Sequence, residues 1–342
     1  MIRKLALSVA TGLAALASVP AQAGPPYPPS TVITGIRWET GTYRWSGSGG
    51  DIWPVTWAAD GTLLTAWGDG EIGCREKVSY GVAAIGAADP STALQSLHCG
   101  PARINRGKIM ALVATPGSLW AAMASQPLAS FRGFPVWRST NGGRSWIASG
   151  TPLSFMPDSF VQFGRGNAGA PGGYVYLLDS GGTTTWLIRA PASSVANPAT
   201  HEYFSGTATT PAWSRSRSAA RSIFTDPAGV WRPSITYVPG LRRYLLAAAH
   251  APSKLPSSNR QGLFEAPNLW GPWRTVYYSD SFLGMRGGFY LGMHFPIKWQ
   301  SADGRTLWAT FSCHNSTAPK SCGPYHDRFN VMKVTLTLGS AR

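Results

Sequence analysis

The chain has 342 residues and a formal net charge of +15, although only 13% of its residues are charged. Glycine (39), proline (27) and tryptophan (15) are abundant, and 44% of the residues are hydrophobic. This composition excludes a disordered chain, because disordered segments lack the aromatic and apolar residues found here. Many turn residues between short aromatic segments favour an all-β fold, and no amphipathic helix longer than about two turns is found.

The first residues have the pattern of a targeting segment. Arg3 and Lys4 precede an apolar run over residues 5–19, and Ala21-Gln22-Ala23 has the small residues of a cleavage site. The run is shorter than the roughly 20 residues that a membrane span requires, and no later segment is long and apolar enough either. The sequence predicts a secreted protein, periplasmic or extracellular, with a signal peptide at residues 1–23, an extended leader at 24–35 and a single domain at 36–342.

Four cysteines suit an oxidising compartment. They allow three connectivities, and local pairing predicts the disulfides Cys74–Cys99 and Cys313–Cys322. The alternative is a zinc site, in which Cys313 and Cys322 act together with His314 and His326. Secretion favours the disulfides. The sequence predicts no cofactor and no metal ion.

Residues 51–69 have the pattern of a β-hairpin. Apolar residues alternate on the way into Asp60-Gly61, a dipeptide typical of tight hairpin turns. Residues equally distant from the turn face each other in an antiparallel pair. Asp51 and Asp69 are therefore expected side by side at the open end of the hairpin.

Similar hairpins recur at intervals of about 60 positions, which indicates a repeat architecture. The copies are expected at residues 108–123, 160–179, 232–250 and 296–311. Each hairpin is followed by one or two further strands, so the sequence predicts five four-stranded sheets around an axis, a five-bladed β-propeller. An early strand, 36–38 or 42–45, is expected to pair into the last sheet and close the ring. A β-sandwich is the alternative, but it does not explain the interval.

The segment Ser139–Trp146 resembles the Asp-box turn of sialidase-type propellers, with Asn141 at the usual Asp position and Ser145 at the usual Thr position. The motif predicts a hairpin turn held by its own side chains. It supports the fold and carries no chemistry.

Several short motifs together resemble one family. They are Asp51–Trp57, Trp67–Gly70, Phe163–Gly164, Tyr174–Tyr176, Glu265–Trp273 and Lys298–Trp299. These motifs look like those of the secreted bacterial propellers catalogued as a domain of unknown function, some members of which are glycoside hydrolases that cut D-arabinan in mycobacterial-type cell walls. The resemblance implies a propeller fold and glycan hydrolysis. It does not fix the substrate, because sites vary freely on one fold.

In a propeller, the innermost strands begin at the rim of a central funnel where ligands bind. The expected rim residues are Asp51, Asp69, Lys108, Gln162, Arg165, Arg232 and His294, with His314 opposite His294. Glycoside hydrolysis needs two carboxyl groups. Asp51 is predicted to be the nucleophile or base and Asp69 the acid, its pKa raised by its carboxylate neighbour. Glu71 and Asp179 are reserve carboxylates. Substrate binding is assigned to Arg232, His294, His314 and Lys108, with Trp53 or Trp67 stacking on a sugar ring.

The sequence therefore predicts a glycoside hydrolase acting on an extracellular or cell-wall polysaccharide. The alternatives are a polysaccharide lyase on an acidic glycan and a non-catalytic propeller that binds carbohydrate or a surface. The basic charge fits attraction to an acidic polymer or a solvated surface. No nucleic-acid-binding module accompanies it, so nucleic acid is not an expected partner. The sequence carries no signal of oligomeric state.

Overall fold

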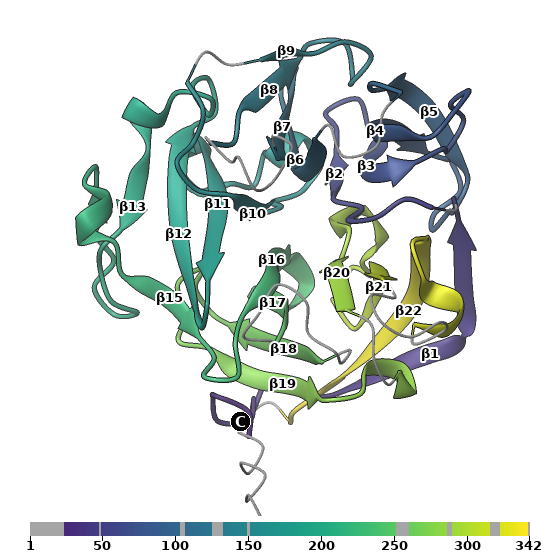
Figure 1. The fold of residues 1–342 in the computed structure, drawn as a ribbon. Coiled ribbons are helices and arrows are strands. Elements are labelled where there is room, and N and C mark those ends of the chain that lie inside the picture. Colours follow the sequence, from purple (N-terminus) through teal and green to yellow (C-terminus); the bar gives the residue numbers. More distant parts are fainter. Residues whose placement is uncertain are drawn as a thin grey trace, which may run out of the picture.

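The computed structural model describes residues 24–47, 49–102, 107–124, 133–148, 151–250, 260–285, 289–314 and 322–340. The predicted signal peptide lies outside the described residues. Five β-sheets are arranged around a central axis (Figure 1), which confirms the five-bladed β-propeller. Among the helices of the described ranges, none has the length and apolar character needed to cross a membrane.

Each sheet is one blade, and its strands follow each other in the chain from the axis outward. Blade 1 contains β2 (Val55–Trp57), β3 (Leu63–Gly70), β4 (Val78–Ile85) and β5 (Leu94–Cys99). Blade 2 contains β6 (Lys108–Thr115), β7 (Ser118–Ala124), β8 (Val136–Ser139) and β9 (Ile147–Ala148). Blade 4 contains β16 (Trp231–Val238), β17 (Arg243–Ala249), β18 (Gln261–Ala266) and β19 (Arg274–Ser279).

Blade 3 departs from the expected four strands. It contains β10 (Pro157–Phe160), β11 (Tyr174–Gly181), β12 (Thr184–Pro191), β13 (Glu202–Phe204), β14 (Trp213–Ser214) and β15 (Ser222–Thr225). The short β13 pairs only with the second half of β12, at Ile188 and Arg189. The first half of β12 is therefore available to β15, which pairs with it at Thr184 and Thr185.

Blade 5 closes the ring. It consists of β20 (Phe289–His294), β21 (Thr306–His314), β22 (Phe329–Leu338) and, from the other end of the chain, β1 (Ile33–Ser46). β1 runs antiparallel beside β22, as the purple and yellow strands of Figure 1 show, with Ile36 opposite Leu336. The predicted ring closure is confirmed. The first strand of the chain and the last blade are thus joined in one sheet, which holds the ring closed.

The inner strands are buried because neighbouring blades cover both of their faces. β6 has the sequence KIMALVAT, and every residue after Lys108 is buried. Such a continuous apolar run is typical of a strand covered on both sides. The outer β9, by contrast, is exposed at both residues. Burial thus decreases from the axis toward the rim of the disc.

The leader before β1 packs against two blades. Tyr27 lies 5.2 Å from Phe224 and 5.9 Å from Phe264, measured between ring centroids. The amide of Ser30 donates to the carbonyl of Thr275 on β19 (2.8 Å), and its hydroxyl donates to Glu265 (2.7 Å). The segment before residue 33 therefore belongs to the packed domain.

Both predicted disulfides are confirmed. Cys74–Cys99 joins the loop after β3 to the end of β5, with Cα atoms 5.9 Å apart. Cys313–Cys322 joins the end of β21 to the segment before β22, with Cα atoms 6.0 Å apart. All four cysteines are consumed, so the alternative zinc site with cysteine ligands is wrong.

The turn at Ser139–Trp146 is held by its own side chains, as its motif predicts. The hydroxyl of Ser139 accepts a hydrogen bond from the amide of Gly143 at 2.9 Å. Asn141 Oδ1 accepts from the amides of Arg144 and Ser145, at 3.1 and 2.9 Å. The side-chain oxygens of Ser139 and Asn141 thus satisfy three backbone amides of the turn.

The predicted fifth hairpin is wrong in its first half. The copy expected at residues 296–311 places the start of its inner strand at Pro296, by analogy with Pro54 in the first hairpin. The inner strand β20 instead ends at His294, and Ile297–Trp299 forms a 3₁₀ helix in the connection to β21. The longer connection shifts the register, so that His294 faces Thr310 and His314 faces Phe289. The two histidines are not cross-strand partners.

Candidate active site

Charged side chains gather where the innermost strands begin. Asp51 precedes β2, Lys108 is the first residue of β6, Asp158 lies at the start of β10, and Arg232 lies at the start of β16. These strands are neighbours around the axis (Figure 1). Four of the five blades therefore contribute a charged group to one end of the central channel.

Asp51, Lys108 and Asp69 form the centre of this cluster. Lys108 Nζ lies 2.5 Å from Asp51 Oδ2 and 2.6 Å from Asp69 Oδ2. The three side chains are each only 14–19% exposed. One ammonium group therefore holds both predicted catalytic carboxylates, and the predicted proximity of Asp51 and Asp69 is observed.

The register differs from the prediction by one residue. Asp51 pairs with Gly68, not Asp69, through hydrogen bonds in both directions. Ile52 and Trp53 have positive φ angles of 77° and 57°. They interrupt the pairing with β3 at the point between Asp51 and the start of β2. Gly68 is required here, because an added Cβ would lie 2.5 Å from Asp51 Oδ1 and 2.7 Å from Lys108 Cδ.

Burial dominates the electrostatics of this cluster. It raises the pKa of Asp51, with the Lys108 ammonium opposing the rise and Asp327 and Asp69 adding to it. Burial also pulls the pKa of Lys108 down, but Asp51 and Asp69 outweigh it, so that the pKa of Lys108 is raised. Asp51 Oδ1 is buried without a hydrogen-bond partner among the described residues. The group with the raised pKa is thus Asp51, which the sequence analysis predicted to be the nucleophile or base.

Asp158 is a site residue that the sequence analysis missed. It is 5% exposed, and its Oδ2 accepts a hydrogen bond from the hydroxyl of Ser180 at 2.6 Å. Burial raises its pKa to about 6, with Arg232 and Ser180 opposing. The signal was available, because Asp158 begins its inner strand just as Lys108 and Arg232 do. The predicted hairpin began at Phe160, two residues too late.

Arg232 lies near enough to Asp158 and Asp51 to feel the charge of both, in agreement with its predicted place at the rim. Burial lowers its pKa, while the charges of Asp158 and Asp51 raise it. Its Nε is buried and has no hydrogen-bond partner in the described ranges. Its backbone adopts a φ of 50°, a left-handed conformation that is uncommon away from glycine. Such strained backbone is found more often at functional sites than elsewhere.

The two histidines lie in different surroundings. His294 is partly buried on β20, and burial lowers its pKa to about 4, so its imidazole is neutral near pH 7. His314, at the end of β21, contacts Asp327 through Nδ1 at 2.9 Å. This hydrogen bond raises the pKa of His314, and Asp51 and Lys108 also act on it electrostatically. His314 is thus close to the central cluster, although not through the predicted pairing.

The predicted stacking role of Trp53 and Trp67 is wrong. Both side chains are 0% exposed and pack in the core between blades 1 and 5. Their rings lie 5.9 Å apart, and Trp53 Nε1 donates to the carbonyl of Gly50 at 3.0 Å. Neither indole can reach a sugar ring.

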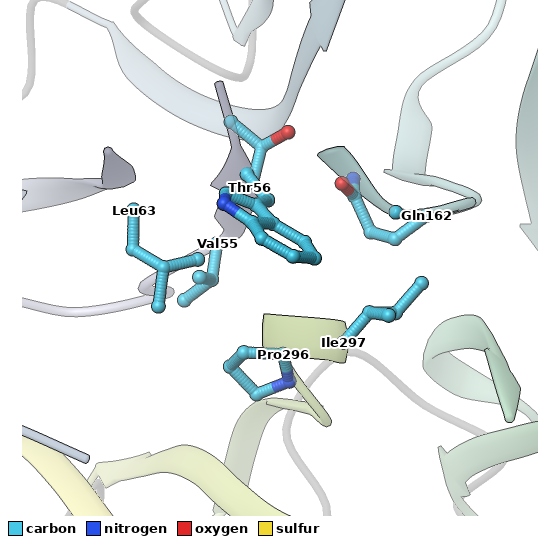
Figure 2. A pocket seen from close by; sticks show the side chains of 8 residues that line it. Val55, Thr56, Leu63, Gln162, Pro296 and Ile297 are labelled. Atoms are coloured by element: carbon cyan, nitrogen blue, oxygen red, sulfur yellow. The ribbon is translucent and has the colours of Figure 1, made fainter. Parts of the chain in front are cut away.

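Gln162 and Arg165 lie away from the charged cluster, so their predicted place at the same rim is wrong. Arg165 Nε donates to the carbonyl of Ala59, in the turn of the first hairpin. Figure 2 shows Gln162 across a small pocket from Val55 and Thr56, with Pro296 and Ile297 below. The pocket holds about 10 Å³, hardly enough for one water molecule. Apolar side chains thus pack at the turn end of the inner strands.

The reserve carboxylates are placed differently from each other. Glu71 is exposed after β3. Asp179, at the end of β11, binds Arg217 at 2.9 Å, and burial raises its pKa to about 7. It lines a cavity of about 180 Å³ in blade 3, together with Trp186, Tyr203 and others. Asp158 acts on Asp179 electrostatically, so this cavity borders the central cluster.

Comparisons with solved structures support the fold. A presumed hydrolase from Bacteroides ovatus aligns with a TM-score of 0.54 and 12% identity, over 85% of this chain and 87% of that one. The GH43_1 enzyme from Xanthomonas citri, solved with xylose, aligns with a TM-score of 0.51 and 11% identity, over 88% and 94%. GH43B of a Bacteroides ovatus xyloglucan locus aligns with a TM-score of 0.52 and 11% identity, over 86% of this chain and 54% of that one. No protein-family model and no curated protein sequence matches the chain.

At such identities the likeness concerns the fold. The chain is a five-bladed β-propeller of the architecture seen in GH43 enzymes. What it does must be argued from its own side chains, because one fold supports many activities.

Proposed function

We propose that the protein is a secreted glycoside hydrolase that acts on a polysaccharide through Asp51 and Asp69. The observation that carries the proposal is the shared ion pair, in which Lys108 holds both carboxylates at one end of the channel. Two carboxyl groups at a defined separation are the usual requirement for hydrolysis of a glycosidic bond. The solved structures of GH43 enzymes on the same fold agree with this chemistry.

The two carboxyl groups take different roles because their surroundings differ. A proton donor needs a pKa near the working pH, and burial raises the pKa of Asp51. Asp51 is therefore the general acid that protonates the leaving oxygen. Asp69, whose charge is stabilised by the Lys108 ammonium, is the nucleophile. These roles are the reverse of those expected from the sequence.

Arg232 and His294 are assigned to substrate binding. The guanidinium of Arg232 carries a buried Nε without a hydrogen-bond partner in the described ranges, and the neutral ring of His294 can donate and accept. Both suit the hydroxyl groups of a sugar. Asp158 supplies a negative charge that acts electrostatically on Arg232.

The carboxyl separation indicates the stereochemical outcome. Each Oδ2 lies within 2.6 Å of the same nitrogen, so the two oxygens are no more than about 5 Å apart, which is shorter than the roughly 6.5–9.5 Å separation of inverting glycosidases. We expect the first product to keep the anomeric configuration of the substrate. Proton NMR of the reducing end during early turnover tests this, and inversion would contradict the assignment of Asp69 as nucleophile.

The central test compares two variants on a panel of cell-wall polysaccharides. Asp51→Asn and Asp69→Asn should each lower kcat by roughly 100- to 10,000-fold. Asp60→Asn is the matched control: this exposed residue lies in the turn of the same hairpin, and an amide oxygen can still accept from Thr62. Full activity in either site variant would reject the pair.

Aryl glycosides of the released sugar separate the two roles. A good leaving group needs no protonation, so Asp51→Asn should keep activity on such substrates while Asp69→Asn loses it. The opposite pattern would restore the roles predicted from the sequence. Unsaturated products that absorb ultraviolet light would indicate the lyase, and binding without any product would indicate the non-catalytic propeller.

A further inference from the structure

A second cluster lies beside the candidate active site, and none of its side chains is assigned to catalysis or substrate binding in the proposed hydrolysis. His314, at the end of β21, and His326 with Asp327, just before β22, offer three ligand atoms within 4.8 Å of one another. Asp327 Oδ1 lies 2.9 Å from His314 Nδ1 and 3.6 Å from His326 Nδ1. The side chains are partly exposed, at 37%, 38% and 19% respectively.

Covalent and hydrogen bonds hold the two segments together. The disulfide Cys313–Cys322 joins the residue next to His314 to the turn that leads to His326. The amide of Asp327 donates to the carbonyl of Cys313 at 2.8 Å, and its carbonyl accepts from the amide of Gly50 at 3.2 Å. The backbone that carries the cluster is therefore fixed before any ligand binds.

The spacing suits a metal ion. Four-coordinate zinc has bonds of about 2.0–2.1 Å to histidine nitrogen and carboxylate oxygen, so its ligand atoms lie roughly 3.3 Å apart. The two His–Asp separations of 2.9 and 3.6 Å fall on either side of this value, and the two histidine ligand atoms lie within 4.8 Å of each other. Two imidazoles and one carboxylate favour zinc and similar transition metals over calcium, which takes six to eight oxygen ligands.

We propose that His314, His326 and Asp327 form a binding site for a divalent transition metal of the zinc type, with at least one position open to solvent. The residues that the sequence analysis weighed as a zinc site thus divide into two groups. The two cysteines form a disulfide, and the two histidines lie with Asp327 in the proposed metal site. The site borders the candidate active site, because Gly50, which binds the carbonyl of Asp327, directly precedes Asp51.

The test measures metal binding directly and does not depend on hydrolysis. The secreted chain without an affinity tag is freed of metal with a chelator and titrated with zinc chloride in a calorimeter. We expect one equivalent to bind, and cobalt(II) to give the visible absorption of a four- or five-coordinate site. Excess calcium should not displace the zinc.

Two variants and one control locate the site. His326→Ala and Asp327→Asn should weaken zinc binding by more than the roughly 10- to 100-fold loss that follows removal of an outer-shell partner. Asp327→Asn keeps the side-chain shape and both backbone hydrogen bonds, so it tests the ligand without disturbing the fold. His98→Ala, on β5 of blade 1, should bind zinc as the unchanged protein does. No zinc binding, or unchanged binding in both site variants, would overturn the proposal, whatever the result for hydrolysis.

Discussion

Lys108 is the residue on which the candidate active site depends most. Two carboxylates this close would repel each other, and the ammonium that lies 2.5 and 2.6 Å from them compensates their charge. A single cation placed between two acids also fixes both side chains. Precise placement of this kind is what a catalytic pair requires.

Removing this cation should therefore be costly. We expect Lys108→Met to lower the free energy of unfolding by on the order of 3 kcal/mol at pH 7, because it leaves buried carboxylates unpaired. Without the ammonium the folded-state pKa values of the carboxyl groups would rise, so the loss should shrink as the pH falls toward about 4. Urea unfolding at both pH values measures this.

Lys298→Met is the matched control. Lys298 pairs with Asp89 at 3.3 Å, and Asp89 is 41% exposed. Such a surface pair should contribute less than about 1 kcal/mol. An equal loss for Lys108→Met at pH 7 and pH 4 would contradict the proposed role of its charge.

Asp179 predicts a pH dependence of stability. Burial raises its pKa to about 7, above the ordinary value of 3.8, despite the opposing charge of Arg217. The folded state therefore favours the neutral acid, and this stabilisation is lost as the pH rises from about 4 through 7. Asp179→Asn, which is always neutral, should gain stability relative to the unchanged protein between pH 5 and pH 8. Thermal unfolding of both proteins at pH 5 and at pH 8 measures this gain. The same pH dependence in the two proteins would contradict the prediction.

At the scale of elements, the closing strand β1 carries the clearest prediction. Ile33 is 0% exposed, in the core shared by blades 4 and 5, and pairs with Leu338. Ile33→Ala should lower the free energy of unfolding by about 2–5 kcal/mol, since it leaves a cavity. Thr40→Ala, at an exposed position of the same strand, should change it by less than about 0.5 kcal/mol. Chemical denaturation of both variants compares them, and similar small changes would show that β1 contributes little.

The inner hairpins could be predicted from the sequence, whereas details of register could not. β6 and β7 are long apolar strands with a two-residue connection. Both the hydrophobic pattern and the short turn therefore indicate a hairpin in the sequence. The prediction of the fifth hairpin was wrong because the segment around Pro296 and Trp299 has the same sequence pattern as Pro54 and Trp57. In the structure, Pro296 caps a 3₁₀ helix over Ile297–Trp299. Local pattern cannot distinguish the two, because the difference depends on packing against neighbouring blades.

The candidate site was predicted in the same uneven way. Asp51, Asp69 and Lys108 followed from their places at hairpin mouths, and the structure brings them together. Trp53 was misassigned because positive φ angles at Ile52 and Trp53 turn the indole into the core. Backbone conformations of this kind leave no trace in a hydrophobic pattern.

At the scale of the whole molecule, four of the five blades place a charged group at one end of the axis, and apolar groups pack at the other end. Asp51, Lys108 and Arg232 face one end, whereas Val55, Pro296 and Ile297 line the small pocket of Figure 2. The charged groups of the candidate site therefore lie at the end of the axis opposite the small apolar pocket. The cavity beside Asp179 extends that side toward blade 3.

The pairing of β1 with β22 also sets an order of events during synthesis. The strand made first has as its neighbour the strand made last, some 300 residues later. Until β22 has been made, β1 lacks its neighbour in the sheet and the ring of blades cannot close. A chain cut short before β22 would therefore lack the pairing that joins the first strand to the last blade.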